Sequence, residues 1–124
     1  LIGDLSFYHD MNGLLAAKYG INLTIVVINN SGGGIFSFLP IANAGMENFQ
    51  QFWTTDTGLN FKKAAELYNC MYSRAATVEE LGDCIQKSFE SSSIKIIEIR
   101  TDINENIETR RKFLNDVKQS LSGI

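Results

Sequence analysis

Short apolar strands alternate with amphipathic helices, and this alternation predicts an α/β protein with three layers, α/β/α, around a mainly parallel sheet. The order along the chain is strand, helix, strand, a long excursion, and then helix, strand, helix, strand, helix. Residues 23–28 form an unbroken apolar, β-branched run, which is typical of a strand covered by helices on both faces. Hydrophobic residues make up 44% of the chain and charged residues 20%, which fits a globular α/β domain.

The amino-terminal half predicts two strand ends that are each followed by a turn. Leu1 and Ile2 resemble the last residues of a strand, and a turn over residues 3–6 follows. Apolar residues near helical spacing predict a helix over 10–19. The strand at 23–28 ends in a second turn, over 29–34. Because the chain lacks an initiating Met and opens on a strand end, we expect an amino-terminally truncated, partial domain.

The carboxyl-terminal half predicts regular elements after an excursion over residues 35–58, which we expect to be partly helical. These elements are a helix over 60–68 capped by Asn60, a strand over 70–73, a helix begun by a capping box of Thr77 and Glu80, a strand over 94–99, and a helix begun by Asp102. We expect each of the last two helices to bury one apolar face. The faces are Val78, Leu81, Ile85 and Phe89 in the first, and Ile103, Ile107, Leu114, Val117 and Leu121 in the second.

Composition excludes several classes of function. The net charge is −3 and the basic residues are scattered, so we expect no nucleic-acid partner. No apolar run approaches the length of a membrane span and no signal peptide is recognisable, so we expect no membrane insertion and a cytoplasmic location. Cys70 and Cys84 lack metal-ligand spacing and the chain has a single His, which argues against zinc and for two buried thiols.

Asp4 and Asn30 carry the clearest chemical signal. Each follows a strand of one predicted βαβ unit, so both turns should meet at the same edge of the sheet, where ligands of such sheets bind. A carboxylate, an amide oxygen and the carbonyl near Gly32 form a hard-metal site, with Mg²⁺ preferred and Mn²⁺ tolerated. The turn amides after Asp4 and the Ser6 hydroxyl suit an anion. The residues therefore predict a diphosphate bridged to the protein by a metal.

The same residues resemble the cofactor signature of thiamine-diphosphate-dependent enzymes. The local sequences Gly3–Leu14, Asn29–Pro40 and Phe52–Thr55 are similar to the menaquinone-pathway synthase family of that superfamily. The resemblance covers essentially the whole chain and is strong through residue 67. Most members of the superfamily have glycine where this chain has Leu5. The resemblance implies the thiamine-diphosphate-binding fold, with residues 1–124 as the diphosphate- and metal-binding domain.

The resemblance also implies a role for each matching position. The metal ligands would be Asp4, the Asn30 side chain and the Gly32 carbonyl; the cofactor contacts would add Leu5, Ser6 and Ile35; the substrate wall would be Ile35, Phe36 and Leu39. The implied reaction decarboxylates 2-oxoglutarate and adds the resulting succinyl semialdehyde carbanion to isochorismate. The cofactors would be thiamine diphosphate and Mg²⁺ or Mn²⁺.

In this family the activating Glu lies on a separate amino-terminal domain, so we expect no catalytic residue within these 124 residues. The pyrimidine-binding and central domains would lie upstream and are absent here. The site would be completed across a subunit interface of a homodimer or tetramer, and this polypeptide alone should be inactive. His9 and Arg74 lie where a role in the site is conceivable, but solvated or packing roles are the simpler interpretation.

Three other interpretations stay open. Another thiamine enzyme, such as an acetolactate synthase or a 2-oxoacid decarboxylase, would share the metal signature, although Leu5 and the run over 35–40 argue against it. A non-catalytic α/β module that binds a phosphorylated ligand would need no metal, and an inert scaffold would bind nothing.

Overall fold

The computed structural model describes residues 1–43, 45 and 47–122. Its centre is one sheet of four parallel strands in the order β1-β2-β4-β3. The strands are β1 (Ile2–Gly3), β2 (Leu23–Asn29), β3 (Met71–Ala75) and β4 (Ile94–Arg100). The predicted parallel α/β sheet is confirmed, although β3 begins and ends later than the strand predicted over 70–73.

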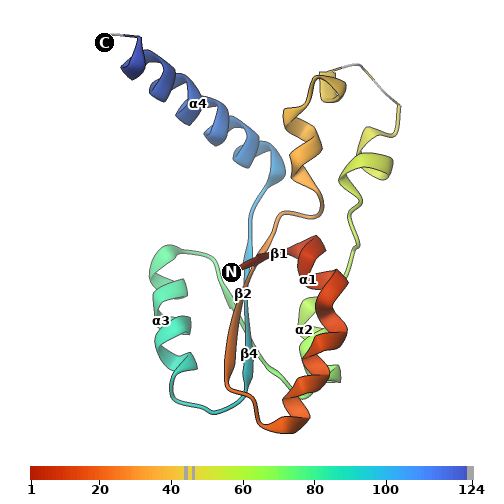
Figure 1. Ribbon diagram of the computed structural model, residues 1–124, viewed down its shortest axis with the longest axis vertical. Coiled ribbons are helices and arrows are strands. Elements are labelled where there is room, and N and C mark those ends of the chain that lie inside the picture. Colours follow the sequence, from red (N-terminus) through yellow and green to blue (C-terminus); the bar gives the residue numbers. More distant parts are fainter. Residues whose placement is uncertain (44, 46, 123–124) are drawn as a thin grey trace.

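Helices cover both faces of the sheet, as Figure 1 shows with the sheet seen edge-on. One layer contains α1 (Asp4–Asp10), the 3₁₀ helix η1 (Met11–Tyr19) and α2 (Phe61–Leu67), and the other contains α3 (Val78–Ser88). The hydroxyl of Thr24 on β2 donates to that of Ser88, which places α3 on the face away from α1. The predicted three-layer arrangement is confirmed.

The hydrophobic core lies between the sheet and the layer of α1, η1 and α2. Its buried members are Phe7, Leu14, Val27, Phe61, Ala65, Ile94 and Ile96. The rings of Phe7 and Phe61 meet edge to face with centroids 5.0 Å apart. β4 is an inner strand, and its residues from Ile94 to Glu98 are all buried.

The three predicted helix caps are present. The Asn60 side chain accepts from the N–H of Lys63, and the Thr77 hydroxyl accepts from Glu80. Asp102 caps α4 (Ile103–Leu121) through the N–H groups of residues 104 and 105. The Glu80 carboxylate reaches back to the N–H of Ala76 at 2.7 Å, one residue before the position expected of a capping box.

Residues 3–6 are not a turn, contrary to the prediction. β1 passes directly into α1 at Asp4, whose carboxylate accepts the N–H of Leu5 and so satisfies a free donor of the first helical turn. The helix predicted over 10–19 is also wrong in type, since residues 11–19 form a 3₁₀ helix. Gly20 ends it as predicted, in the left-handed conformation with φ of 69°.

The predicted buried faces of the last two helices are only partly correct. Val78 and Phe89 stand at the two ends of α3 and are exposed, while Leu81 and Ile85 are half-buried. α4 leaves the sheet and extends beyond its carboxyl edge (Figure 1), so its residues Leu114, Val117 and Leu121 are exposed. Ile103 and Ile107, in its first turns, are half-buried.

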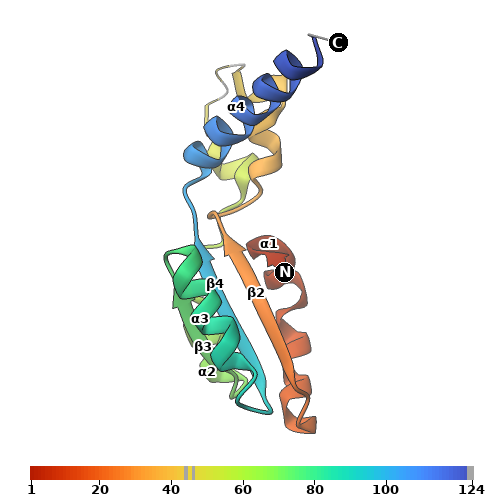
Figure 2. The ribbon, with the colours of Figure 1, turned by 90° about the vertical axis from the view of Figure 1, so that its left-hand side faces the viewer.

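The excursion is partly helical, as predicted, and lies beside α4 above the carboxyl edge of the sheet (Figure 2). It contains the 3₁₀ helices η2 (Gly34–Phe38) and η3 (Pro40–Asn43) and the π-helix η4 (Gln50–Thr54). The Trp53 ring packs edge to face on Phe36 and stacks on Phe49. The Arg110 guanidinium of α4 lies 4.5 Å from the centre of the Phe38 ring, which joins α4 to the excursion.

Cys70 and Cys84 are free, and both are half-buried where full burial was expected. Burial raises the pKa of the Cys70 thiol, which keeps it protonated. Within residues 1–43, 45 and 47–122, no helix is both long enough and apolar enough to cross a membrane.

Candidate cofactor-binding site

Asp4 and Asn30 follow two neighbouring strands at the same edge of the sheet. Gly3 of β1 pairs with Ile28 of β2 in parallel register, so the two strands end side by side. Asp4 comes directly after this pair and is 6% exposed. On the neighbouring strand, Asn29 ends β2, and the turn that contains Asn30 follows it. The topology thus brings the two predicted segments together.

The Asp4 carboxylate joins the two segments by hydrogen bonds. Its Oδ1 accepts the N–H of Leu5 at 2.8 Å, and its Oδ2 accepts the N–H of Gly32 at 2.7 Å. Each carboxylate oxygen has two lone pairs, so both keep an acceptor position free. A buried carboxylate held in this way is oriented before any ligand arrives.

The glycine turn has a conformation and a packing that only glycine tolerates at position 32. Gly32 has φ of 127°, and a Cβ there would lie 2.2 Å from the Thr54 carbonyl oxygen at the end of η4. The N–H of Gly33 donates to the same oxygen at 2.5 Å. The turn is therefore clamped between Asp4 on one side and the excursion on the other.

The side chain of Asn30 lies against the end of this turn. Its side-chain amide is close enough to Gly34 that a Cβ at residue 34 would lie 3.0 Å from it. The Gly32 carbonyl accepts the N–H of Gly34 at 3.0 Å and keeps a second lone pair. A carboxylate, a carboxamide and this carbonyl would together supply oxygen ligands of the kind that Mg²⁺ prefers. The residues present fit a hard divalent cation.

The described part of the chain contains no group of three or more His, Cys, Asp or Glu side chains that could hold a metal. A predicted site with one carboxylate, one amide and one carbonyl would not form such a group. Mg²⁺ commonly binds through one or two carboxylates and completes its shell with phosphate oxygens and water. The donor set thus fits a metal that arrives with a diphosphate.

The other predicted cofactor and substrate contacts differ in their exposure. Leu5 packs on it, because a Cβ at Gly33 would lie 3.2 Å from the Leu5 Cδ1 atom. Ser6, in the first turn of α1, is exposed, so its hydroxyl is accessible. Ile35 and Leu39 are 69% and 45% exposed, whereas Phe36 is half-buried against Trp53. Two apolar side chains next to the turn are therefore free to contact a bound molecule.

Sequence reasoning missed a buried carboxylate behind this site. Glu98 on β4 is 1% exposed, and its Oε1 accepts from Asn29 Nδ2 at 2.7 Å and from Arg100 Nε at 2.8 Å. Its Oε2 accepts a short hydrogen bond from the Tyr72 hydroxyl. The one available signal was a glutamate inside the apolar run over 94–99.

The hydrogen bonds decide the ionisation of this cluster. Burial by itself raises the pKa of Glu98, but the hydrogen bonds from Tyr72, Arg100 and Asn29 outweigh it and hold the pKa below its ordinary value. Burial, together with the hydrogen bond to Glu98, raises the pKa of Tyr72 to about 12. The hydrogen bond to Glu98 raises the pKa of Arg100. The cluster therefore consists of an anionic Glu98 between a neutral phenol and a guanidinium.

His9 and Arg74 are both exposed. The His9 ring lies against that of Tyr8, with centroids 5.5 Å apart. Arg74 pairs in register with Glu98 across the sheet but makes no ion pair with it, since the Glu98 partner is Arg100. The solvated interpretation of both residues remains the simpler one.

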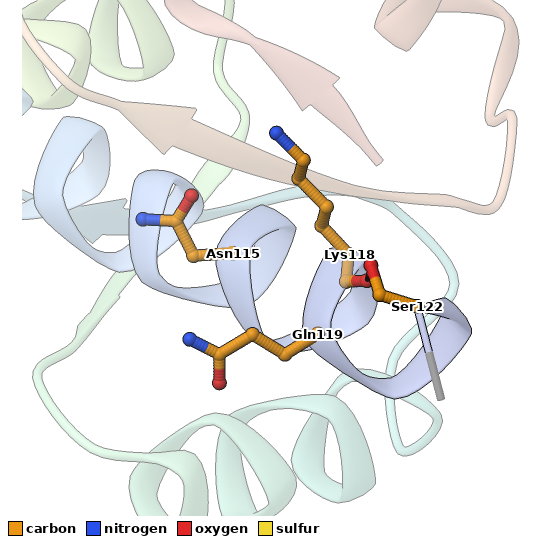
Figure 3. Close-up of a pocket in the computed structure, with 4 residues that line it drawn as sticks. All are labelled: Asn115, Lys118, Gln119 and Ser122. Carbon is orange, nitrogen blue, oxygen red and sulfur yellow. Dashed lines mark hydrogen bonds between the residues drawn. The ribbon is translucent and has the colours of Figure 1, made fainter.

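A concavity of about 550 Å³ lies far from these residues, along α4 (Figure 3). It is lined by Asn115, Lys118 and Gln119 of α4 and by Ser122, which directly follows the helix. Lys118 is the single charged residue among them. A surface of one helix without converging polar groups has no features of a cofactor site.

Comparison with known proteins identifies the family of the chain. The family model described as thiamine pyrophosphate enzyme, C-terminal TPP binding domain, matches residues 1–99; thiamine pyrophosphate and thiamine diphosphate are the same cofactor. Among solved structures, the thiamine diphosphate-dependent 4-hydroxybenzoylformate decarboxylase of Rhodococcus jostii RHA1 is similar over 82% of this chain and 19% of its own, with a TM-score of 0.67 and 27% identity. Benzoylformate decarboxylase from Polynucleobacter necessarius has a TM-score of 0.69 over 82% of this chain and 19% of its own, and at 17% identity it supports the fold alone.

The curated relatives include the synthase that the sequence resembles, known as MenD. The 2-succinyl-5-enolpyruvyl-6-hydroxy-3-cyclohexene-1-carboxylate synthase of Listeria monocytogenes serotype 4b (strain F2365) is 53% identical over 100% of this chain. The synthase of the same name from Bacillus pumilus (strain SAFR-032) is 45% identical over 98%. The chain spans 21% of the length of each relative. By the match over residues 1–99, the chain belongs to the family of the thiamine pyrophosphate enzyme C-terminal TPP binding domain.

Proposed function

We propose that this chain is the diphosphate- and metal-binding part of a MenD-type 2-succinyl-5-enolpyruvyl-6-hydroxy-3-cyclohexene-1-carboxylate synthase. The full-length enzyme would decarboxylate 2-oxoglutarate and add the succinyl semialdehyde carbanion to isochorismate in menaquinone biosynthesis. Identity of 53% to a synthase of this name supports this assignment over that of a 4-hydroxybenzoylformate decarboxylase, to which the identity is 27%. The enzyme would be cytoplasmic.

The observation that carries the proposal is the hydrogen bond between Gly32 N–H and Asp4 Oδ2, which brings the two predicted segments into one site. The metal, Mg²⁺ or Mn²⁺, would bind Asp4, the Asn30 side chain and the Gly32 carbonyl. Ser6 would donate its hydroxyl to the diphosphate, and Leu5 would pack beside it. Thiamine diphosphate, when bound, supplies the electron sink for the decarboxylation.

In this reaction, the residues of this chain would bind and orient the cofactor and the substrate. Ile35 would contact the thiazolium part of the cofactor, and Ile35, Phe36 and Leu39 would form an apolar wall that excludes water from the reacting carbons. Exposure of Ile35 and Leu39 supports this role, because their apolar surface is free for a ligand. The activating Glu would come from an upstream pyrimidine-binding domain, across the interface of a homodimer or tetramer. Residues 1–124 would then be one part of the intact enzyme.

Calorimetry on the full-length protein tests the proposal. Thiamine diphosphate should bind with Mg²⁺ present and bind far more weakly after the metal is removed with a chelator. The substitutions Asp4→Ala and Asn30→Ala should abolish the metal-dependent part. Binding that ignores both the metal and the two substitutions would instead indicate a phosphate-ligand module without a metal.

An assay of decarboxylation separates the enzyme from its parts. The full-length protein should consume 2-oxoglutarate in the presence of thiamine diphosphate, Mg²⁺ and isochorismate. Residues 1–124 alone should not, since the activating Glu is expected elsewhere. Turnover of this polypeptide at the full-length rate would refute the division of the site between domains.

A further inference from the structure

Glu98 is linked to the proposed metal-binding turn by a continuous series of hydrogen bonds. Its Oε1 accepts from Asn29 Nδ2 at 2.7 Å, and the Asn29 Oδ1 accepts from Ser31 N–H at 3.1 Å. The Asn29 carbonyl accepts from Thr101 N–H at 2.9 Å, just beyond the end of β4. The side chain and the main chain of Asn29 are thus both fixed to β4.

The backbone that follows Asn29 needs this support. Ser31 has φ of 63°, in the left-handed region that non-glycine residues seldom adopt, and Gly32 follows with φ of 127°. Such conformations persist only where surrounding contacts hold them. Asn30 lies between Asn29 and Ser31. The hydrogen bonds that hold these two residues therefore also hold the backbone from which the Asn30 carboxamide projects. The Gly32 N–H then binds Asp4.

We infer that Glu98 is a positioning residue for the metal–diphosphate site, which acts through Asn29 on the turn that holds Asn30 and Gly32. This inference rests on the proposed function. A buried glutamate with three donors is a fixed anchor, because Tyr72 and Arg100 hold its two oxygens while Asn29 is attached. Removal of a group that hydrogen-bonds to a metal ligand and orients it commonly lowers the metal affinity about 10–100-fold.

The test uses the full-length protein with Glu98→Gln. Glutamine keeps the shape of the side chain but removes its negative charge, so the hydrogen bonds from Asn29 and Arg100 become weaker even where the new NH₂ group donates to the Tyr72 hydroxyl. In calorimetric titrations of Mg²⁺ at saturating thiamine diphosphate, the apparent Kd should rise about 10–100-fold. Asn29→Ala removes the hydrogen bonds to Glu98 and Ser31 at a half-buried residue, and the apparent Kd should rise by a similar factor. This variant tests the inference if Glu98→Gln fails to fold.

A double-mutant cycle separates positioning from general destabilisation. If Glu98 acts through Asn29, the protein with both substitutions should bind Mg²⁺ no more weakly than the weaker single variant. Losses of affinity that multiply would overturn the inference. The free energy of unfolding without cofactor, measured in the same proteins, shows how much each substitution disturbs the fold itself.

Lys95 provides a matched control on the same strand. It is 4% exposed, and its Nζ donates to Asn22 Oδ1 and to the Ser91 carbonyl at the other end of β4. Lys95→Met should lower the free energy of unfolding but leave the Kd for Mg²⁺ unchanged. Unchanged metal affinity in both Glu98→Gln and Asn29→Ala, with the wild type binding, would overturn the positioning role alone. A wild type without metal-dependent cofactor binding would overturn the proposed function as well.

Discussion

The N–H of Gly32 donates a hydrogen bond of 2.7 Å to Oδ2 of Asp4, across 28 positions of sequence. Because the two residues follow neighbouring parallel strands, this bond joins the start of α1 to the turn after β2. The carboxylate of Asp4 therefore has a structural role before any metal arrives. Its structural and binding roles can be separated by experiment.

Asp4→Ala should destabilise the protein even without cofactor. The substitution leaves the N–H groups of Leu5 and Gly32 without their acceptor in a buried place, which costs about 1–3 kcal/mol. Denaturant unfolding of the cofactor-free protein measures the loss. Asp10→Ala, at the exposed end of the same helix, should change the free energy of unfolding by less than about 0.5 kcal/mol. Equal losses in the two variants would contradict the structural role.

Gly32→Ala should disturb both the turn and the excursion. The added Cβ would lie 2.2 Å from the Thr54 carbonyl oxygen, and the φ of 127° is unfavourable for alanine. Backbone strain of this kind costs about 1–3 kcal/mol, and the contact adds to it. Thermal unfolding should show a lower Tm, and the fluorescence of Trp53, next to Thr54, should change.

Gly13→Ala is the matched control for that substitution. No atom lies within 4 Å of a Cβ built at Gly13, and its φ is outside the left-handed region. The alanine there should leave the stability unchanged or raise it by about 0.4–1 kcal/mol, since it restricts the unfolded chain. A loss at Gly13 as large as at Gly32 would show that the close approach of Thr54 is unimportant.

The sequence pattern predicts the sheet and the site edge well, for physical reasons. An apolar run such as residues 23–28 has few alternatives to a buried strand, and parallel topology then brings the ends of β1 and β2 together. The caps at Asn60, Thr77 and Asp102 are local hydrogen bonds, so nearby sequence is sufficient to predict them.

The errors concern contacts between residues that are far apart in the sequence. A helical stripe through Leu114, Val117 and Leu121 shows that α4 has an apolar face, but periodicity does not say what covers it. Glu98 was missed because its partners Asn29 and Tyr72 come from other strands, 69 and 26 positions away. A charged residue in an apolar run is a signal only when such partners can be located.

Truncation of Phe61 in α2 and of Phe89 at the end of α3 should have very different effects on stability. Phe61 is 1% exposed and meets Phe7 edge to face, so Phe61→Ala should cost about 3–5 kcal/mol. Phe89, which helical spacing placed on a buried face, is 72% exposed, and Phe89→Ala should change stability by less than about 0.5 kcal/mol. Denaturant unfolding compares them. A large loss at Phe89 would favour the sequence-based face of α3.

Tyr72 should make the stability depend on pH in the alkaline range. Burial, followed by the hydrogen bond to Glu98, raises its pKa from 10.0 to about 12 in the folded protein. A raised folded pKa means that the stability due to the neutral phenol is complete below pH 10 and is lost as the pH rises from about 10 to about 12. Tyrosinate absorbance should therefore show a component that ionises near pH 12.

Tyr72→Phe should remove that late component and flatten the fall in the free energy of unfolding over the same range. The comparison isolates one phenol, because every other side chain is the same in both proteins. Tyr19→Phe, which removes an exposed hydroxyl, should leave the late component in place. If the component persists in Tyr72→Phe, it belongs to another group, and the raised pKa of Tyr72 is contradicted.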